Sequence, residues 1–200
     1  MVIKLTGLLI AAGFSSRMGK PKALLLQDGL PFAIVILKKM ILICDKIVVV
    51  FGHSSEKIKR ELQVFFINYS DELKSSVKFV TNEQFEKGMF SSLKCGLNEL
   101  KNSEWLLYHF VDQPGVPAIF YRKFTDQIDN EYNWIQPTYK NEKGHPLLLH
   151  NFIFSSILEL PDDLSLREIS RNTEVKKKYW DCANKEILQD IDYPSDLKQL

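Results

Sequence analysis

Four continuous apolar runs constrain the fold of this 200-residue chain more than any other feature of its sequence. They cover residues 5–12, 46–52, 77–81 and 104–112, and each is flanked by residues that favour turns. Runs without polar alternation are typical of parallel strands that helices cover on both faces, whereas half-exposed antiparallel strands alternate. We therefore expect these segments to be strands of a mostly parallel sheet.

Helical patterns separate the runs. Apolar residues recur at helical spacing over 58–69, where Tyr69 is the last of the series, over 90–100, and over 120–128 after Pro117. Alternating strands and helices predict a doubly wound α/β sheet with helices on both faces. Residues 132–139 and 146–150 read as two further strands, which form either a hairpin or an excursion from the main sheet. The sequence contains no repeat or linker, so we expect residues 1–200 to form one domain.

Composition excludes several classes of protein. The 26 basic and 25 acidic residues give a net charge of +1, so the charge balance predicts no nucleic-acid partner and no membrane surface. Cys44, Cys95 and Cys182 are far apart and form no C-x-x-C pair, which favours buried thiols in a reducing cytoplasm. The longest apolar segment is interrupted by Lys38 and Lys39, so no membrane span is expected.

The stretch "LLIAAGFSSRMGKPKALL" (8–25) follows a buried strand with a glycine turn and three cations, Arg17, Lys20 and Lys22. Ligands of α/β sheets bind at the carboxyl ends of the strands, where a glycine lets backbone amides approach a phosphate. We therefore expect this loop to bind a nucleotide triphosphate. Its predicted nucleotide-binding residues are Ala11, Ala12, Gly13, Ser15, Ser16, Arg17 and Lys22.

This loop is not a Walker A motif. Five residues separate Gly13 from Gly19, and Pro21 replaces the hydroxyl that would hold magnesium. No G-x-G-x-x-G follows the strand either. The alternative interpretation is a glycine-rich turn with solvated cations.

Carboxylates follow other segments. Asp112 ends the fourth run in "YHFVDQP" and is a candidate ligand for Mg²⁺, although it could instead cap the helix near Pro117. Near the end of the chain, Asp190 or Asp192 could supply a second ligand, because magnesium usually takes one or two carboxylates. The alternative is that Asp192 belongs to the turn that contains Asp196.

Three other positions complete the candidate site. Thr81, at the end of the third run, and Gly88 and Ser92, at the start of a helix, are assigned to nucleotide binding. A serine cap of that helix is the alternative. The turn Gly144–His145–Pro146 is assigned to the acceptor, although a lone histidine in a turn is more often structural.

Together these segments resemble the molybdenum cofactor cytidylyltransferase family, within the MobA-like NTP transferase superfamily. The first loop is similar to its signature L-A-A-G-x-S-x-R-M-G-x-P-K-x-L-L, and "GMFSSLKCGL" is similar to G-M-x-x-S-L-x-x-G-L. "DQP", "GHP" and "DIDYPSDL" follow in the family's order, so the resemblance runs from Leu8 to Leu197.

The resemblance implies a Rossmann-like enzyme that transfers CMP from CTP to the terminal phosphate of molybdopterin and releases pyrophosphate. It implies that Arg17, Lys22 and Asp112 are catalytic and that Asp112 and Asp192 hold Mg²⁺. It also implies a molybdoenzyme or its maturation factor as a partner.

Two features bear on the substrates. In "DDLSLR", Asp162 and Ser165 stand where the family has glycines, so the acceptor could differ from the usual pterin. Relatives that use GTP typically lack the G-M-x-x-S-L segment, which favours CTP. The alternatives are a guanylyltransferase, another sugar- or alcohol-phosphate nucleotidyltransferase, or a cofactor carrier without catalytic activity.

Overall fold

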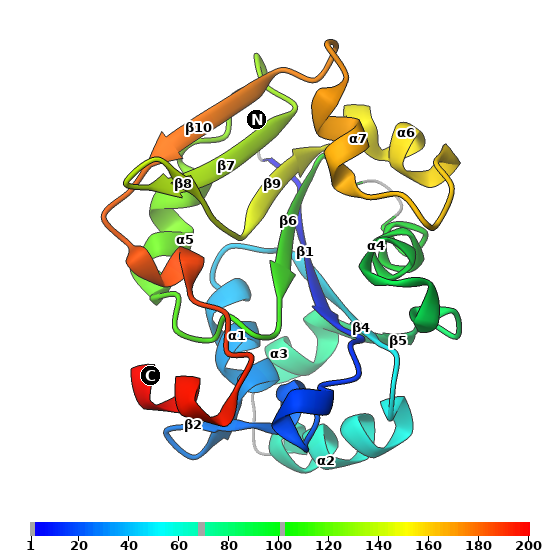
Figure 1. Cartoon of the computed structure of the whole chain (residues 1–200), viewed down its shortest axis with the longest axis vertical. Helices are drawn as coiled ribbons and strands as arrows, with labels where there is room; N and C mark the ends of the chain where they lie inside the picture. The colour runs from blue at the N-terminus through cyan, green and yellow to red at the C-terminus, as the bar shows by residue number, and fades with distance from the viewer. Residues whose placement is uncertain (1–2, 68–70, 101–102) are drawn as a thin grey trace.

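The computed structural model describes residues 3–67, 71–100 and 103–200 and folds them into one α/β domain around a central sheet (Figure 1). Seven strands of the sheet follow the order β10-β7-β9-β6-β1-β4-β5 in the described part of the chain, with the short β8 beside β7. The strands are β1 (Leu5–Ala11), β4 (Lys46–Phe51), β5 (Val77–Thr81), β6 (Trp105–Phe110), β7 (Trp134–Tyr139), β8 (Glu142–Lys143), β9 (Leu147–His150) and β10 (Lys177–Asp181). A separate small pair joins β2 (Leu26–Gln27) and β3 (Leu30–Pro31).

The four apolar runs form the parallel half of the sheet, as predicted. β1 is buried along its whole length and pairs in parallel with β4 on one side and β6 on the other, so that Leu8 faces Val48 and Tyr108. β5 extends this half beyond β4. The carboxyl ends of β1, β4 and β6 therefore meet at one end of the sheet, which is where a ligand is expected.

The other half of the sheet contains a reversed strand. β9 is antiparallel to both β6 and β7, whereas β7 and β10 run parallel to each other. Lys140 and Asn141 turn the chain between β7 and β8 with positive φ angles of 49° and 67°. The two late strands are therefore a hairpin-like pair within the main sheet. β10 was not expected from periodicity, because its sequence "KKYWD" is an edge strand without an apolar run.

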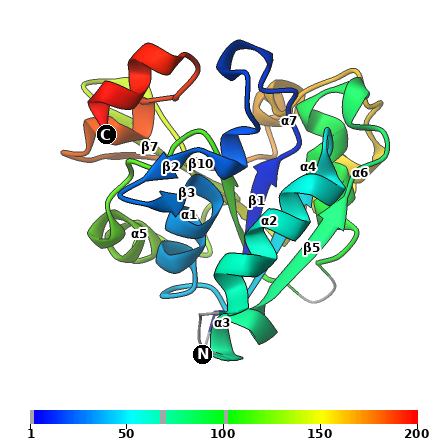
Figure 2. The same cartoon turned by 90° about the horizontal axis from the view of Figure 1, so that it is seen from below.

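Helices cover both faces of the sheet (Figures 1 and 2). They are α1 (Phe32–Met40), α2 (Ser55–Ile67), α3 (Asp71–Ser76), α4 (Met89–Leu97), α5 (Ala118–Thr125), α6 (Phe154–Glu159) and α7 (Leu166–Arg171). The three predicted helices are α2, α4 and α5, while Tyr69 lies outside the described residues. Within the described residues, no helix combines the length and the apolar character needed to cross a membrane.

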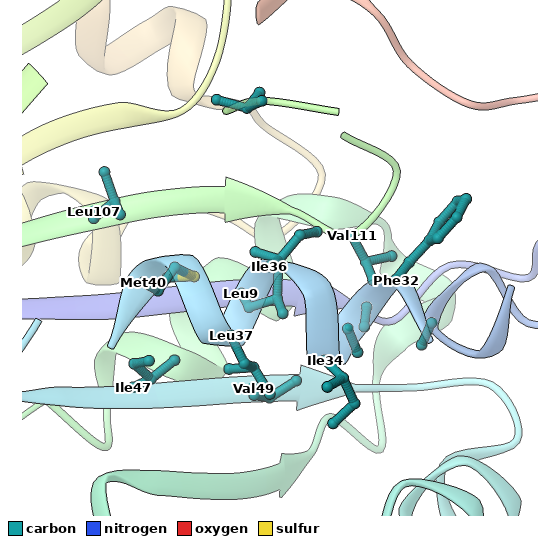
Figure 3. Close-up of a cluster of buried hydrophobic side chains, with 14 of the residues drawn as sticks. Leu9, Phe32, Ile34, Ile36, Leu37, Met40, Ile47, Val49, Leu107 and Val111 are labelled. Atoms are coloured by element: carbon teal, nitrogen blue, oxygen red, sulfur yellow. The ribbon is translucent and has the colours of Figure 1, made fainter. Parts of the chain in front are cut away.

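Two apolar cores lie between the helices and the sheet, one on each face. Figure 3 shows part of the first, in which α1 packs Leu37 and Met40 against Leu9 of β1 and Val49 of β4. The second core places Phe90 and Leu93 of α4 on the opposite face. Because α1 is buried, its apolar segment is an interior helix with its two lysines in the last turn.

Candidate active site

Hydrogen bonds from two later residues of the loop after β1 converge on Ser15. Ser15 adopts a left-handed φ of 51°, and its backbone carbonyl accepts a hydrogen bond from Met18 N at 3.0 Å. The Ser15 hydroxyl accepts another from Lys22 N at 3.0 Å, which fixes the far end of the loop. The short turn η1 (Ser16–Met18) lies between them and ends at Gly19.

The loop's two glycines serve different purposes. Gly19 has a φ of 66°, in the region that favours glycine. Gly13 has no such φ, and no heavy atom lies within 4 Å of the position that a Cβ would take. The backbone at Gly13 therefore borders open space, as it also does at Gly19, and only Gly19 combines that space with a positive φ.

Lys22 joins three segments that are far apart in the sequence. Its Nζ atom lies 3.0 Å from Asp112 Oδ2, at the end of β6, and 2.5 Å from Asp192 Oδ1, near the carboxyl terminus. Figures 1 and 2 both place the loop after β1 beside this terminal segment. Burial lowers the pKa of Lys22, but the two carboxylates outweigh it and hold that pKa above its ordinary value. The ammonium is therefore charged at neutral pH.

Arg17 is the second cation of the site. Its Nη1 atom lies 3.9 Å from Asp192 Oδ2, and its guanidinium carbon lies 5.3 Å from the ring centre of Tyr193. The Arg17 side chain is 63% exposed, so it can move toward an incoming anion.

Backbone contacts fix both carboxylates. Ile191 N donates to the Asp112 carbonyl oxygen at 2.9 Å, and Asp196 Oδ2 accepts from Asp192 N at 3.0 Å. Asp190 instead accepts from Gln113 Nε2 at 2.8 Å, and burial raises its pKa, as does the negative charge of Asp112. The geometry therefore favours Asp192 over Asp190 as the partner of Asp112. Asp196 forms the predicted turn. It accepts a hydrogen bond from the Asp192 backbone, which leaves the Asp192 carboxylate free to contact Lys22.

The loop that follows Asp112 is held by a lysine of α1. Lys39 Nζ donates to the carbonyl oxygens of Pro114 at 2.6 Å and Val116 at 2.8 Å. Burial lowers the pKa of Lys39 to about 8. Because Pro117 caps α5 without a side-chain hydrogen bond, the alternative role of Asp112 as a helix cap is not observed.

The loop after β1 and the two carboxylates that face it line a cavity of about 410 Å³, here called the first cleft. It contains most of the predicted nucleotide and metal residues: Ala11, Ala12, Gly13, Ser15, Ser16, Arg17, Lys22, Gly88, Ser92, Asp112 and Asp192. Thr81 is not brought to this cleft, and its hydroxyl accepts a hydrogen bond from Lys59 Nζ at 2.6 Å.

The start of α4 forms one wall of the first cleft. Gly88 has φ 100° and ψ −176°, which only glycine adopts readily, and it precedes the helix without a side-chain cap. Ser91 and Ser92 therefore lie inside the helix, and the serine-cap alternative is wrong. Both hydroxyls accept hydrogen bonds from Asn82 Nδ2, at 2.9 and 3.0 Å. Sequence reasoning missed the buried Asn82, although it follows β5 directly, where strand-end polar residues are candidates.

A second cavity, of about 720 Å³, adjoins the first and shares Gly88, Met89 and Phe110 with it. We call it the second cleft. It combines aromatic and basic side chains: Tyr108, Trp134, Tyr179, Lys87, Lys143 and Arg167.

Of the predicted acceptor turn, only His145 lines the second cleft. Its ring lies 4.8 Å from that of Phe110, and burial lowers its pKa to about 4, so it is neutral at pH 7. A Cβ on Gly144 would lie 2.6 Å from the Ile187 carbonyl oxygen, so Gly144 has a packing role. The structure does not bring Gly144 or Pro146 to the cavity.

The loop 162–167 lines the second cleft, and the two residues that depart from the family pattern both have structural roles in it. Asp162 accepts from Lys94 Nζ at 2.8 Å and Lys87 Nζ at 3.1 Å, which ties the loop to α4. Ser165 caps α7 and forms a capping box with Glu168.

A glycine-containing loop that faces two carboxylates at the carboxyl ends of parallel strands lies where α/β domains bind their ligands. Residues 7–178 match the model of the MobA-like NTP transferase domain, and the chain belongs to this family of nucleotidyltransferases.

Two relatives illustrate the range of that family. A probable molybdenum cofactor guanylyltransferase from Bacillus cytotoxicus is 28% identical over 176 residues, which cover 85% of this chain and 81% of the relative. The molybdenum cofactor cytidylyltransferase of Escherichia coli is 23% identical over 189 residues, or 94% and 91% of the two chains. The chain is therefore related to both kinds of transferase.

Solved structures share the fold. A nucleotidyl transferase from Methanothermobacter thermautotroptrophicus superposes with a TM-score of 0.78 at 20% identity, over 98% of this chain and 95% of the other. A protein from Mycobacterium tuberculosis, solved as a complex with manganese, has a TM-score of 0.70 at 19% identity, over 98% and 97%.

The residues of the first cleft fit a divalent cation. Asp112 and Asp192 both turn an oxygen atom toward the Lys22 ammonium, so a divalent cation between the two carboxylates would displace that ammonium. Across the described ranges there is no cluster of three or more His, Cys, Asp or Glu side chains that could hold a metal. Two carboxylates suit Mg²⁺, which usually takes one or two of them and completes its shell with phosphates and water.

Proposed function

We propose that this chain transfers CMP from CTP to the terminal phosphate of molybdopterin and releases pyrophosphate, with Mg²⁺ as cofactor. The observation that carries the proposal is the convergence of Lys22, Asp112 and Asp192 at the end of the loop after β1. Residues 1–200 act as one nucleotidyltransferase domain in the cytoplasm. A molybdoenzyme or its maturation factor receives the product.

The chain's part in this reaction is positioning and charge neutralisation. A terminal phosphate oxygen of the acceptor attacks the α-phosphorus, a new P–O bond forms, and the bond to the β-phosphate oxygen breaks. The attacking oxygen is already anionic at neutral pH, so no general base is needed. Lys22 and Arg17 stabilise the charge that builds on the departing pyrophosphate. A magnesium ion on Asp112 and Asp192 would screen the repulsion between the two anions.

The two clefts support a two-substrate reaction. They share Gly88, Met89 and Phe110, so an acceptor in the second cleft can extend its phosphate toward a nucleotide in the first. The second cleft offers the half-exposed Tyr179 ring to a planar group, with Lys143 to oppose a phosphate. This combination suits a phosphorylated pterin.

The choice of CTP rests on the G-M-x-x-S-L segment at the start of α4, whose Gly88 and Ser92 line the first cleft. GTP is the second candidate, because the guanylyltransferase of Bacillus cytotoxicus is also a relative.

The test is pyrophosphate release in the presence of magnesium, with CTP, GTP, ATP or UTP. Each nucleotide is offered with and without molybdenum-loaded molybdopterin. Release that needs both CTP and the pterin is the expected result. If GTP with the pterin is the only combination that releases pyrophosphate, the mechanism is retained and the choice of CTP is overturned. If the folded protein binds CTP but releases nothing, the acceptor is another sugar- or alcohol-phosphate, or the chain is a carrier.

A further inference from the structure

Three aromatic rings from separate loops meet beside the first cleft. Phe14 follows β1, His53 follows β4 and Phe85 follows β5. The ring centre of Phe14 lies 5.3 Å from those of both His53 and Phe85, and the other two lie 6.0 Å apart. We call these three residues the aromatic wall.

Two residues of the aromatic wall, Phe85 and His53, contact the ends of β4 and β1. Phe85 packs over Gly52, where a Cβ would come within 2.5 Å of the Phe85 Cβ and 2.6 Å of the Ala12 carbonyl oxygen. Only glycine at position 52 therefore lets Phe85 and the end of β1 approach the end of β4 this closely. His53 N also contacts the Ala12 carbonyl oxygen, at 3.4 Å.

The wall nevertheless remains open to a ligand. Phe14 and Phe85 both line the first cleft, and the Phe14 side chain is 53% exposed. A ring that stays half exposed contributes only part of its apolar area to folding. Its exposed surface is available for another planar group.

The wall and the charged groups flank β1 on opposite sides. β1 lies between β4 and β6 in the sheet. Phe14 contacts rings that follow β4 and β5, whereas Lys22 reaches Asp112 after β6. A nucleotide whose triphosphate lies at the charged side therefore directs its base toward the wall.

We infer that Phe14 and Phe85 form the surface on which the nucleotide base stacks, with His53 supporting Phe14 from the side. This inference rests on the proposed function and specifies how the same cleft holds its nucleotide. Stacking on aromatic rings tolerates every base, because each has a π-face. The wall therefore contributes affinity for cytosine and guanine alike, and the choice between them falls to hydrogen-bonding groups such as Ser92.

The experiment measures the binding of CTP, GTP and inorganic tripolyphosphate by titration calorimetry. Tripolyphosphate carries the charge of the nucleotide but has no base. We expect Phe14→Ala and Phe85→Leu to weaken both nucleotides by about tenfold, the order of loss when a base-stacking aromatic is removed. Tripolyphosphate should bind these variants as it binds the wild type. Phe152→Ala, which alters another half-exposed phenylalanine outside the first cleft, is the matched control and should change nothing.

The outcomes separate this inference from the proposed function. If the wild type binds neither nucleotide nor tripolyphosphate, the proposed function fails and the inference falls with it. If the wild type binds CTP and Phe14→Ala binds it equally well, only the inference is overturned. Equal losses for tripolyphosphate and CTP in a folded Phe14→Ala would also overturn it, because the defect would then lie in the phosphate loop. Phe14 is exposed, so this variant should fold even if Phe85→Leu does not.

Discussion

Substitution of Gly13 tests the phosphate binding proposed for the loop after β1 separately from the contribution of that loop to folding. Gly13→Ala should change the free energy of unfolding by less than about 0.5 kcal/mol, because the new methyl group meets no atom and the φ is ordinary. The same methyl would occupy space beside the backbone where a phosphate approaches, so CTP binding should weaken. Urea unfolding and titration calorimetry measure the two effects.

Gly19→Ala is the matched control in the same loop. It should destabilise the fold by about 1 kcal/mol, because an alanine at a φ of 66° is strained. An unchanged CTP affinity in Gly13→Ala would contradict the assignment of this backbone to phosphate binding.

Lys22 and Lys20 are two cations of one loop with different surroundings. Lys22→Ala should lower pyrophosphate release by about 100-fold or more, because the charge that opposes the leaving pyrophosphate is lost. The exposed Lys20 lies outside the lining of the first cleft, and Lys20→Ala should retain full activity. Circular dichroism would show whether each variant is folded. Full activity in a folded Lys22→Ala would remove this residue from the mechanism.

At the residue scale, sequence reasoning located side chains correctly where their position follows from a strand end. It predicted Gly13, Lys22 and Asp112, which line the first cleft together. It did not locate Thr81 correctly. A position at a strand end does not reveal that the Thr81 hydroxyl accepts a hydrogen bond from Lys59 instead of lining the cleft. Asp192 and its partner Lys22 are 170 positions apart, and only the fold shows that they touch.

Among the elements, the loop between α6 and α7 is held mainly by α4. Lys94 Nζ donates to the Leu160 carbonyl oxygen at 2.7 Å. The hydrogen bonds from Lys94 and Lys87 to the Asp162 carboxylate hold the pKa of Asp162 below its ordinary value. Asp162→Asn should therefore accelerate backbone hydrogen exchange over residues 160–165 while global stability changes little. Mass spectrometry would measure that exchange.

Asp163→Asn removes the same charge one residue away and serves as the control. Its exchange over the same loop should match the wild type. Protonation gives an independent check: the carboxylate's contribution is present above the ordinary pKa and is lost as pH falls through the lowered one. If Asp162→Asn left exchange over 160–165 unchanged, the contacts with α4 would not be what holds the loop.

Elements whose burial is uniform were the easiest to predict. The runs that became β1, β4 and β6 are buried on both faces, so their apolar character has one explanation. α1 shows the opposite case, because its short apolar run before the two lysines has the same pattern as a buried strand. β10 is recognised only through its pairing with β7.

For the molecule as a whole, a buried histidine makes stability depend on pH. His109 is fully buried, with Nδ1 2.7 Å from the Phe110 carbonyl oxygen and Nε2 2.7 Å from the Tyr121 hydroxyl. Nδ1 therefore carries the proton, and Nε2 accepts from the tyrosine. Burial lowers the pKa of His109 to about 3. The unfolded chain takes up this proton near pH 6.5, so the free energy of unfolding should fall as pH drops from about 6.5 to 3.

His109→Gln should flatten that fall and also lower stability at pH 7 by about 1–3 kcal/mol, because buried hydrogen bonds are disturbed. Urea unfolding across the pH range measures both effects. His53→Gln alters an exposed histidine and should keep the wild-type slope. A wild-type slope in His109→Gln would assign the acid sensitivity to other groups, such as His145.

The two outer strands of the described sheet, β5 and β10, both carry lysines. β5 carries Lys78 near its middle, and β10 carries Lys177 and Lys178. Another chain that added a strand to either border would have to strip water from these ammonium groups. Lys177 and Lys178 are already committed to the Ser170 and Gln127 carbonyl oxygens, so they stay beside the strand they protect. Lys177 and Lys178 give β10 a sequence without an apolar run, so the strand was not predicted. The same two lysines disfavour aggregation through this open edge of the sheet.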